Sequence, residues 1–166
     1  RDYSDELPRI PPKDPDEALK TFRLQPGFRI EQVVAEPNVI DPVALTFDEY
    51  GRLYVVEMRG YSEDLEQRLG QVRMLTDTNG DGSFDKNTIF LDDLAWPTGI
   101  GCYDGGIFVA AAPEILYAKD TDGDGRADQR RDVYTGVGRG NVQGRLNNFH
   151  WGLADVFHVS VRLKGA

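Results

Sequence analysis

The chain has 166 residues, of which 40% are hydrophobic and 28% are charged, so it can bury one hydrophobic core. A formal net charge of −9 argues against a nucleic-acid partner, because phosphate binding needs a basic face. The one cysteine, Cys102, excludes an internal disulfide framework, and no apolar run approaches the ~18 residues of a transmembrane helix. We expect Cys102 to be a buried thiol.

The first 21 residues form an extended lead-in, because prolines and charges dominate residues 1–16. A short helix is expected over residues 16–21, with Asp14 or Asp16 as its cap and Pro15 in its first turn. The chain begins at Arg1 without a methionine or a signal peptide, which is expected of a mature or trimmed N-terminus.

Short apolar or alternating runs follow, each bounded by Gly, Asp, Asn or Pro, and no long segment shows a helical period. These runs predict strands. Their residue ranges are 28–35, 43–47, 53–56, 71–75, 88–91, 100–103, 106–111, 114–118 and 132–134.

An internal repeat organises these strands. Residues 53–56 recur as 107–110, and the aspartate-rich residues 77–85 recur as 120–128. The two offsets differ because residues 57–70 are an insertion that the second unit replaces with a short Ala-Pro-Glu link. Each unit therefore has four strands, with the aspartate-rich loop between its third and fourth strands. Units of this size are typical of β-propeller blades.

The predicted fold is an all-β partial β-propeller over residues 22–166, the N-terminal part of a propeller domain. Blade 1 is expected at about residues 28–95, blade 2 at about 96–140, and the start of a third at about 147–166, where Gly152-Leu153 matches Gly99-Ile100. Propellers close with about four to eight blades. We therefore expect the chain to be part of a longer protein. An open β-meander or a β-sandwich is the alternative.

The two aspartate-rich loops share the spacing D-x-[DN]-x-D-G-x-x-D, which places side-chain oxygens at alternate positions. Gly82 and Gly125 occupy the sixth position, where a sharp turn favours glycine. Thr88 and Arg131 replace the glutamate that ends an EF-hand loop, so a structural calcium ion is expected, not a sensor. Turns that bind no ion are the alternative. The predicted ligands are Asp77, Asn79, Asp81, Ser83 and Asp85, and Asp120, Asp122, Asp124, Arg126 and Asp128, with Ser83 and Arg126 acting through backbone carbonyls.

The opposite face of the blades carries other candidate residues, since the loops that enter the first strand and those that join strands two and three share one face. There His150 is a candidate general base, because imidazole exchanges protons near neutral pH. Arg145 and Asn148 are candidate cofactor- or substrate-binding residues. The alternative for His150 is a hydrogen-bonded channel residue without chemistry. Arg59, Tyr61 and Arg68 of the insertion are expected at the same mouth, Trp96 and Trp151 between blades, and His158 in a structural position.

Several motifs together resemble a large family of bacterial propellers that are named membrane-bound dehydrogenases and are abundant in planctomycetes and verrucomicrobia. The motifs are residues 18–37, 41–48, 51–58 and 120–128. Propellers of this family are distantly similar to soluble quinoprotein glucose and sorbosone dehydrogenases. The resemblance implies pyrroloquinoline quinone (PQQ) as a cofactor, with a cytochrome c domain elsewhere in the full protein. In the quinoprotein enzymes an acidic residue stands beside the catalytic histidine, whereas here Phe149 precedes His150.

Two functions are therefore expected. The first is a calcium-stabilised oxidoreductase, periplasmic or extracellular, that oxidises a sugar-like alcohol or aldehyde with PQQ as the electron acceptor. The second is a non-catalytic calcium-binding propeller that binds carbohydrate or protein. A hydrolytic propeller such as a lactonase would need calcium in its central channel, away from the two aspartate-rich loops.

Overall fold

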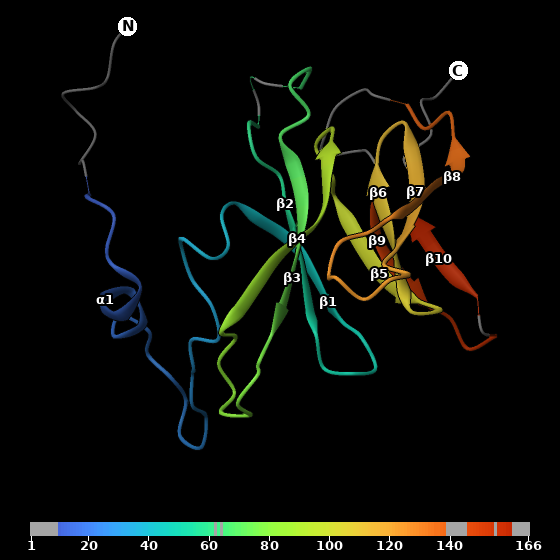
Figure 1. Cartoon of the computed structure of the whole chain (residues 1–166). Coiled ribbons are helices and arrows are strands. Elements are labelled where there is room, and N and C mark those ends of the chain that lie inside the picture. The colour runs from blue at the N-terminus through green and yellow to red at the C-terminus, as the bar shows by residue number, and fades with distance from the viewer. Residues whose placement is uncertain (1–9, 62, 64, 139–145, 155, 161–166) are drawn as a thin grey trace, which may run out of the picture.

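The computed structural model describes residues 10–61, 63, 65–138, 146–154 and 156–160. They form one short helix, α1 (Pro15–Leu19), and ten strands in three sheets (Figure 1). Blade 1 consists of β1 (Pro42–Phe47), β2 (Leu53–Glu57), β3 (Gly70–Thr76) and β4 (Lys86–Leu94). Blade 2 consists of β5 (Gly99–Tyr103), β6 (Gly106–Ala111), β7 (Glu114–Lys119) and β8 (Gln129–Thr135). The third sheet is a hairpin of β9 (Asn147–Trp151) and β10 (Phe157–Ser160).

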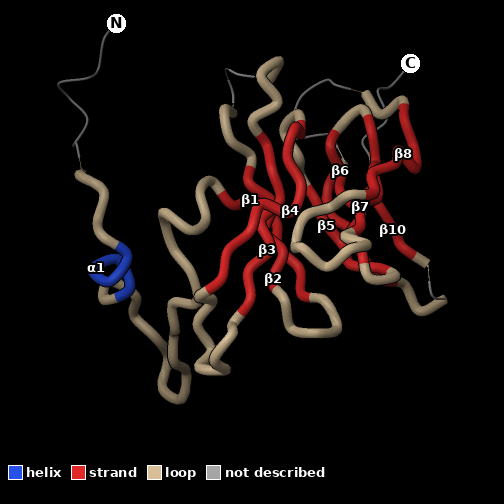
Figure 2. The backbone as a smooth tube through the Cα atoms, in the orientation of Figure 1, coloured by secondary structure: helices blue, strands red, loops and turns tan. Residues whose placement is uncertain are grey.

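Each four-stranded sheet is an antiparallel meander in which strands pair in sequence order. The first strands of the three units, β1, β5 and β9, lie side by side, and the sheets follow one another as layers (Figures 1 and 2). This arrangement confirms the predicted all-β partial propeller. The strand at 106–111 has the predicted bounds, and the other strands from 43 to 135 differ by a few residues at their ends.

The main core lies between the two blades. β2 alternates, so that Tyr54 and Val56 face blade 2 while Leu53 and Val55 face the other way. The buried Ile107 of blade 2 belongs to the same cluster as Tyr54 and Val56. Because neighbouring layers cover both faces of β2, this strand is apolar at four successive positions and ends on the buried Glu57.

Each blade has a second covered face. On blade 1, the segment before β1 covers it through Val34 and Val39, and we call this whole segment, residues 10–41, the lead-in of the structure. On blade 2, the β9–β10 hairpin covers it through Phe149 and Val159. The hairpin lies so close that a Cβ built on Gly99 would stand 2.9 Å from the backbone nitrogen of Asn148.

Two expectations from the sequence are corrected. Residues 28–35 form no strand, since their backbone has no neighbouring strand to pair with among the described residues, although the apolar pattern suggested one. Gly152 does not match Gly99, because β9 begins at Asn147 where β5 begins at Gly99. Asn148 and His150 consequently lie within β9 and not in the loop before it.

The helix starts at Pro15, one residue before its predicted position, and Asp14 is its N-cap. α1 is too short and too polar to cross a membrane, and it is the one helix of the described residues. The predicted blade limits, including the lead-in boundary near residue 21, remain predictions.

Candidate functional site

The first aspartate-rich loop joins β3 to β4 and is held by its own acidic side chains. The Asp77 carboxylate accepts hydrogen bonds from the backbone nitrogens of Gly80 (2.7 Å) and Gly82 (2.8 Å). Asp85 accepts from the Thr78 backbone nitrogen at 2.9 Å and from its hydroxyl at 2.6 Å. Gly82 has φ = 90°, a backbone conformation that residues other than glycine rarely adopt.

The second loop joins β7 to β8 and repeats these contacts. Asp120 accepts from the backbone nitrogens of Gly123 (2.7 Å) and Gly125 (2.9 Å), while Asp128 accepts from Thr121. Two loops from different blades thus adopt the same closed turn. The predicted equivalence of residues 77–85 and 120–128 is therefore also a structural one.

Three carboxylates of the second loop converge. Asp120, Asp122 and Asp124 each place one oxygen within 4.8 Å of the others. A set of closely spaced hard oxygens suits Ca²⁺, so these three residues fit that ion. Asp128 instead engages Thr121 with both of its oxygens, and Ser83 and Arg126 donate their backbone N–H groups to the aspartates two positions before them. In the first loop, Asn79 stands where the second has Asp122, and its amide donates to Asp81 at 3.1 Å.

Hydrogen bonding keeps several of these carboxyls acidic. The backbone N–H of Gly82 lowers the pKa of Asp77, and the Thr78 hydroxyl lowers the pKa of Asp85. The Thr121 hydroxyl does the same for the pKa of Asp128. These groups therefore carry their charge at neutral pH, as calcium ligands must.

Each loop also docks onto the layer before it, which sequence reasoning missed. The eighth residue makes the contact in both cases. The backbone nitrogen of Ala127 donates to the Phe90 carbonyl in β4 at 2.8 Å, and that of Phe84 donates to the Val33 carbonyl in the lead-in at 3.3 Å. The loops thus connect neighbouring layers. No motif in the sequence marks this contact, because it uses the backbone.

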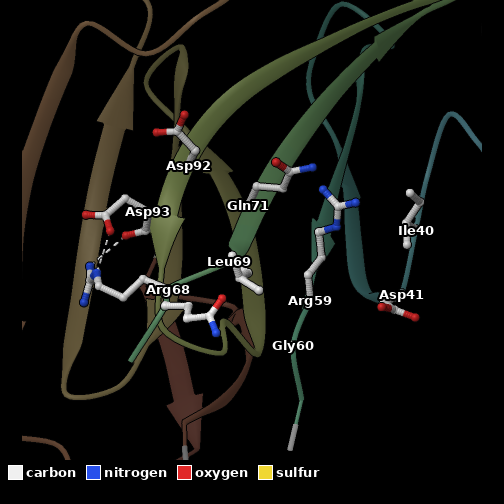
Figure 3. A pocket seen from close by; sticks show the side chains of 11 residues that line it. Ile40, Asp41, Arg59, Gly60, Arg68, Leu69, Gln71, Asp92 and Asp93 are labelled. Atoms are coloured by element: carbon white, nitrogen blue, oxygen red, sulfur yellow. Dashed lines mark hydrogen bonds and ion pairs between the residues drawn. The ribbon is translucent and has the colours of Figure 1, made fainter. Parts of the chain in front are cut away.

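The other end of blade 1 carries a hollow of about 680 Å³, shown in Figure 3. It lies where the insertion between β2 and β3 meets the residues before β1 and the end of β4. We call it the blade 1 hollow. Polar and apolar atoms both line it, and the residues around it are Ile40, Asp41, Arg59, Gly60, Gln67, Arg68, Leu69, Gly70, Gln71, Asp92 and Asp93.

On one wall of the hollow, arginine side chains neutralise the carboxylates of Asp92 and Asp93. Arg68 donates from Nε to the Asp93 carboxylate and from a terminal nitrogen to the Asp93 carbonyl, both at 2.7 Å. From blade 2, a terminal nitrogen of Arg130 lies 4.0 Å from the Asp93 carboxylate, and one of Arg126 lies 3.6 Å from that of Asp92. The second aspartate-rich loop, which contains Arg126, is therefore one ion pair away from the hollow.

Arg59 and Asp41 also line the hollow, but they differ from Arg68 and Asp93 in their contacts. Within the described part of the chain, neither side chain makes a hydrogen bond or an ion pair. Figure 3 shows the Arg59 side chain extending into the hollow, with Asp41 at its edge. The sequence suggested Arg59 for this face, but Asp41 was not among the candidates.

The buried Glu57 lies behind the hollow, and sequence reasoning also missed it. Its carboxylate accepts from the Ile40 backbone nitrogen (2.7 Å), the Gln71 amide (2.5 Å) and Arg73 Nε (3.2 Å). Glu57 thereby fixes Gln71, which lines the hollow, and ties the lead-in to blade 1. The available signal was an acidic residue at the end of the apolar run Leu-Tyr-Val-Val.

His150 lies elsewhere, on β9. It pairs directly with His158 of β10, so the two imidazoles share one face of the hairpin. Phe149 and Val159 pack toward blade 2, which leaves both histidines on the opposite, exposed face. Asn148 has φ = 55°, and its side-chain oxygen accepts from the Phe149 backbone nitrogen. Arg145 lies outside the described residues.

The two tryptophans that were expected between blades differ in burial. Trp96 is buried, with Tyr61 of the insertion packed edge-on against it at 5.2 Å between ring centroids. Trp151 is about half exposed, and its ring centroid lies 5.9 Å from that of Tyr103 in blade 2. Cys102 is only partly buried, yet burial still raises the pKa of its thiol to about 11.

Comparisons with known proteins agree with the fold. The holo form of the PQQ domain of pyranose dehydrogenase from Coprinopsis cinerea is similar in structure, with a TM-score of 0.58 and 20% sequence identity. The similarity covers 80% of this chain, but the chain spans only 29% of that domain. No curated protein matches the sequence of the present chain. A family model described as a domain of unknown function, DUF7133, matches residues 14–165. The chain therefore belongs to the DUF7133 family.

Proposed function

We propose that the chain is the N-terminal part of a secreted, calcium-stabilised propeller oxidoreductase that oxidises a sugar-like alcohol or aldehyde. The observation that carries the proposal is the likeness of its blades to a PQQ-dependent propeller domain. A row of exposed apolar side chains on one face of β1 supports the existence of further blades. These side chains are Val43, Leu45 and Phe47.

The described residues fit PQQ only in part. PQQ is a tricarboxylate. In the blade 1 hollow Arg68 is already paired with Asp93, and the carboxylate of Asp41 would repel an anion drawn to Arg59, so the hollow itself is unsuited to PQQ. The surroundings of β9 are a better location, because this first strand of the third unit carries both His150 and Asn148. The predicted cation, Arg145, lies outside the described residues, and Asn148 and Arg145 stay predicted cofactor ligands. A bound quinone would supply the electron acceptor.

His150 is the proposed general base. His150 lies on β9, the first strand of its unit, which contacts the first strand β5 of blade 2, and there it would accept the proton of a substrate hydroxyl. His158 faces the same way from β10 and is the matched control, since it is a histidine in the same hairpin.

Calcium has a structural role in this proposal. Ions in the two aspartate-rich loops would fix turns that dock on Phe90 and on Val33, and so hold successive layers together. A location outside the cytoplasm, periplasmic or extracellular, agrees with such loops, because extracellular calcium modules work with dissociation constants of about 10⁻⁴–10⁻³ M.

A non-catalytic calcium-binding propeller that binds carbohydrate or protein is the second candidate. The blade 1 hollow favours it, because the hollow has polar side chains of both charges and lies on blade 1, away from His150.

Dye reduction separates the two candidates. It is measured on the full protein that contains this chain, with PQQ, calcium and sugar substrates. The oxidoreductase proposal expects His150→Ala to lower the rate by about 10²-fold or more and His158→Ala to leave it nearly unchanged. Equal rates for His150→Ala and the unmodified protein would refute the assigned base. A spectroscopic titration without PQQ binding would reject the oxidoreductase proposal itself.

A further inference from the structure

We propose that the blade 1 hollow binds a neutral polyhydroxyl ligand, such as one residue of a saccharide, through Arg59 and Asp41. This site is separate from His150 and does not depend on a redox activity.

Charge selects the ligand class. Among the described residues, Arg59 and Asp41 are two charges of opposite sign without a partner at one hollow, while the carboxylates of Asp92 and Asp93 lie near arginines. An anion attracted by Arg59 would meet the carboxylate of Asp41, and a cation would meet the guanidinium. A neutral ligand with neighbouring hydroxyls avoids both conflicts, because one hydroxyl donates to Asp41 while another accepts from Arg59. Both bonds involve a charged partner and are therefore stronger than neutral ones.

Hydrogen bonds hold two of the side chains that line the hollow. Arg68 is fixed by two bonds to Asp93, and Gln71 is fixed by Glu57. Asp41, Arg68 and Asp93 have φ of 49°, 50° and 55°, left-handed conformations that are uncommon for these residues. Half of the six non-glycine residues with positive φ in the described ranges thus line this one hollow. Strained backbone of this kind clusters at functional sites, and a pre-formed site lowers the entropic cost of binding.

The size and surroundings also suit a saccharide. A volume of about 680 Å³ lies within the ~300–1,000 Å³ of small-molecule sites. Asp41 also borders a second depression of about 270 Å³, which Pro42, Val43, Met58 and Tyr61 line. The apolar face of a second sugar ring would pack there beside Tyr61, whose ring is about half exposed. We therefore expect a disaccharide to bind more tightly than a monosaccharide.

Calorimetric titration of the protein tests the site. The probes are cellobiose, maltose and glucose, with glucuronate and glucosamine as charged counterparts. At least one neutral sugar should bind with a dissociation constant on the order of 1 mM. Asp41→Asn and Arg59→Gln should each weaken that binding at least about tenfold, since each replaces a charged partner with a neutral one. Asparagine tolerates the left-handed backbone at position 41, so Asp41→Asn should fold.

The controls separate this inference from the redox proposal. Arg29→Gln, in the exposed lead-in, should leave sugar binding unchanged, and the titration is run without PQQ so that no redox reaction contributes to it. Tighter binding of glucuronate or glucosamine than of every neutral sugar would overturn the neutral-ligand assignment. Sugar binding that survives both hollow variants, or no binding of any neutral probe up to about 50 mM, would overturn the site.

Discussion

Glu57→Gln should destabilise the protein strongly although it changes hardly any volume. Glu57 is fully buried and its carboxylate accepts from Ile40, Gln71 and Arg73. Glutamine has one acceptor oxygen, and its NH₂ group would face one of the three N–H donors. The variant would also leave the Arg73 guanidinium, whose side chain is 17% exposed, without its counter-charge.

The magnitude follows from these losses. Breaking one partner of a buried pair costs about 3–5 kcal/mol, and the remaining exposure of Arg73 places our expectation near the lower end, at about 3 kcal/mol. A chain of this length loses roughly 2–4 °C of melting temperature for each kcal/mol of lost unfolding free energy. The melting temperature should therefore fall by roughly 6–12 °C.

Urea unfolding followed by fluorescence measures the effect. The matched control is Glu31→Gln, the same substitution at an exposed ion pair with Arg29, which should change the free energy of unfolding by less than about 0.5 kcal/mol. A loss below about 1 kcal/mol for Glu57→Gln would refute the idea that this carboxylate ties the lead-in to blade 1.

Three more predictions follow from packing and protonation. Gly99→Ala should destabilise by about 1–3 kcal/mol, because its Cβ would stand 2.9 Å from the Asn148 nitrogen; a wild-type urea midpoint would contradict the close contact of β5 and β9. Thr121→Val should shift acid unfolding to higher pH. Asp128 has a lowered pKa when folded, so its stabilisation is present above the ordinary carboxyl pKa and is lost as the pH falls through the lowered value. An unchanged acid midpoint would argue against that bond. Cys102 should react with a thiol reagent at pH 8 about 100-fold more slowly when folded than in urea, because burial raises its pKa from 9.0 to about 11, and equal rates would show that the thiolate is accessible.

Most strands could be predicted from the sequence, because short apolar runs and turn residues are local signals. The apolar runs from Leu53 to Val56 and from Ile107 to Ala110 each indicated a strand, and their repetition identified both as the second strand of a blade. Residues 28–35 show where the reasoning fails. An alternating pattern indicates one covered face, but a strand also needs a neighbouring strand, which a local pattern cannot reveal.

The site was predictable only where it follows a motif. Both aspartate-rich loops were found from their spacing, and Arg59 and Arg68 from their place in the insertion. Asp41 and Glu57 were missed, because a carboxylate that lines a hollow and a buried one behind it look alike in a sequence. The docking of Ala127 on Phe90 was missed because a backbone hydrogen bond leaves no trace in residue identity.

The most direct test of calcium-stabilised blades is the melting temperature in EGTA and in excess calcium, for the wild type and for Asp124→Asn. At calcium 100-fold above the dissociation constant, each occupied site adds about 2.7 kcal/mol. We therefore predict a rise of roughly 5–10 °C per site in the wild type and a smaller rise in Asp124→Asn, which removes one of three converging carboxylates. Identical melts of the wild type in EGTA and in calcium would contradict the account.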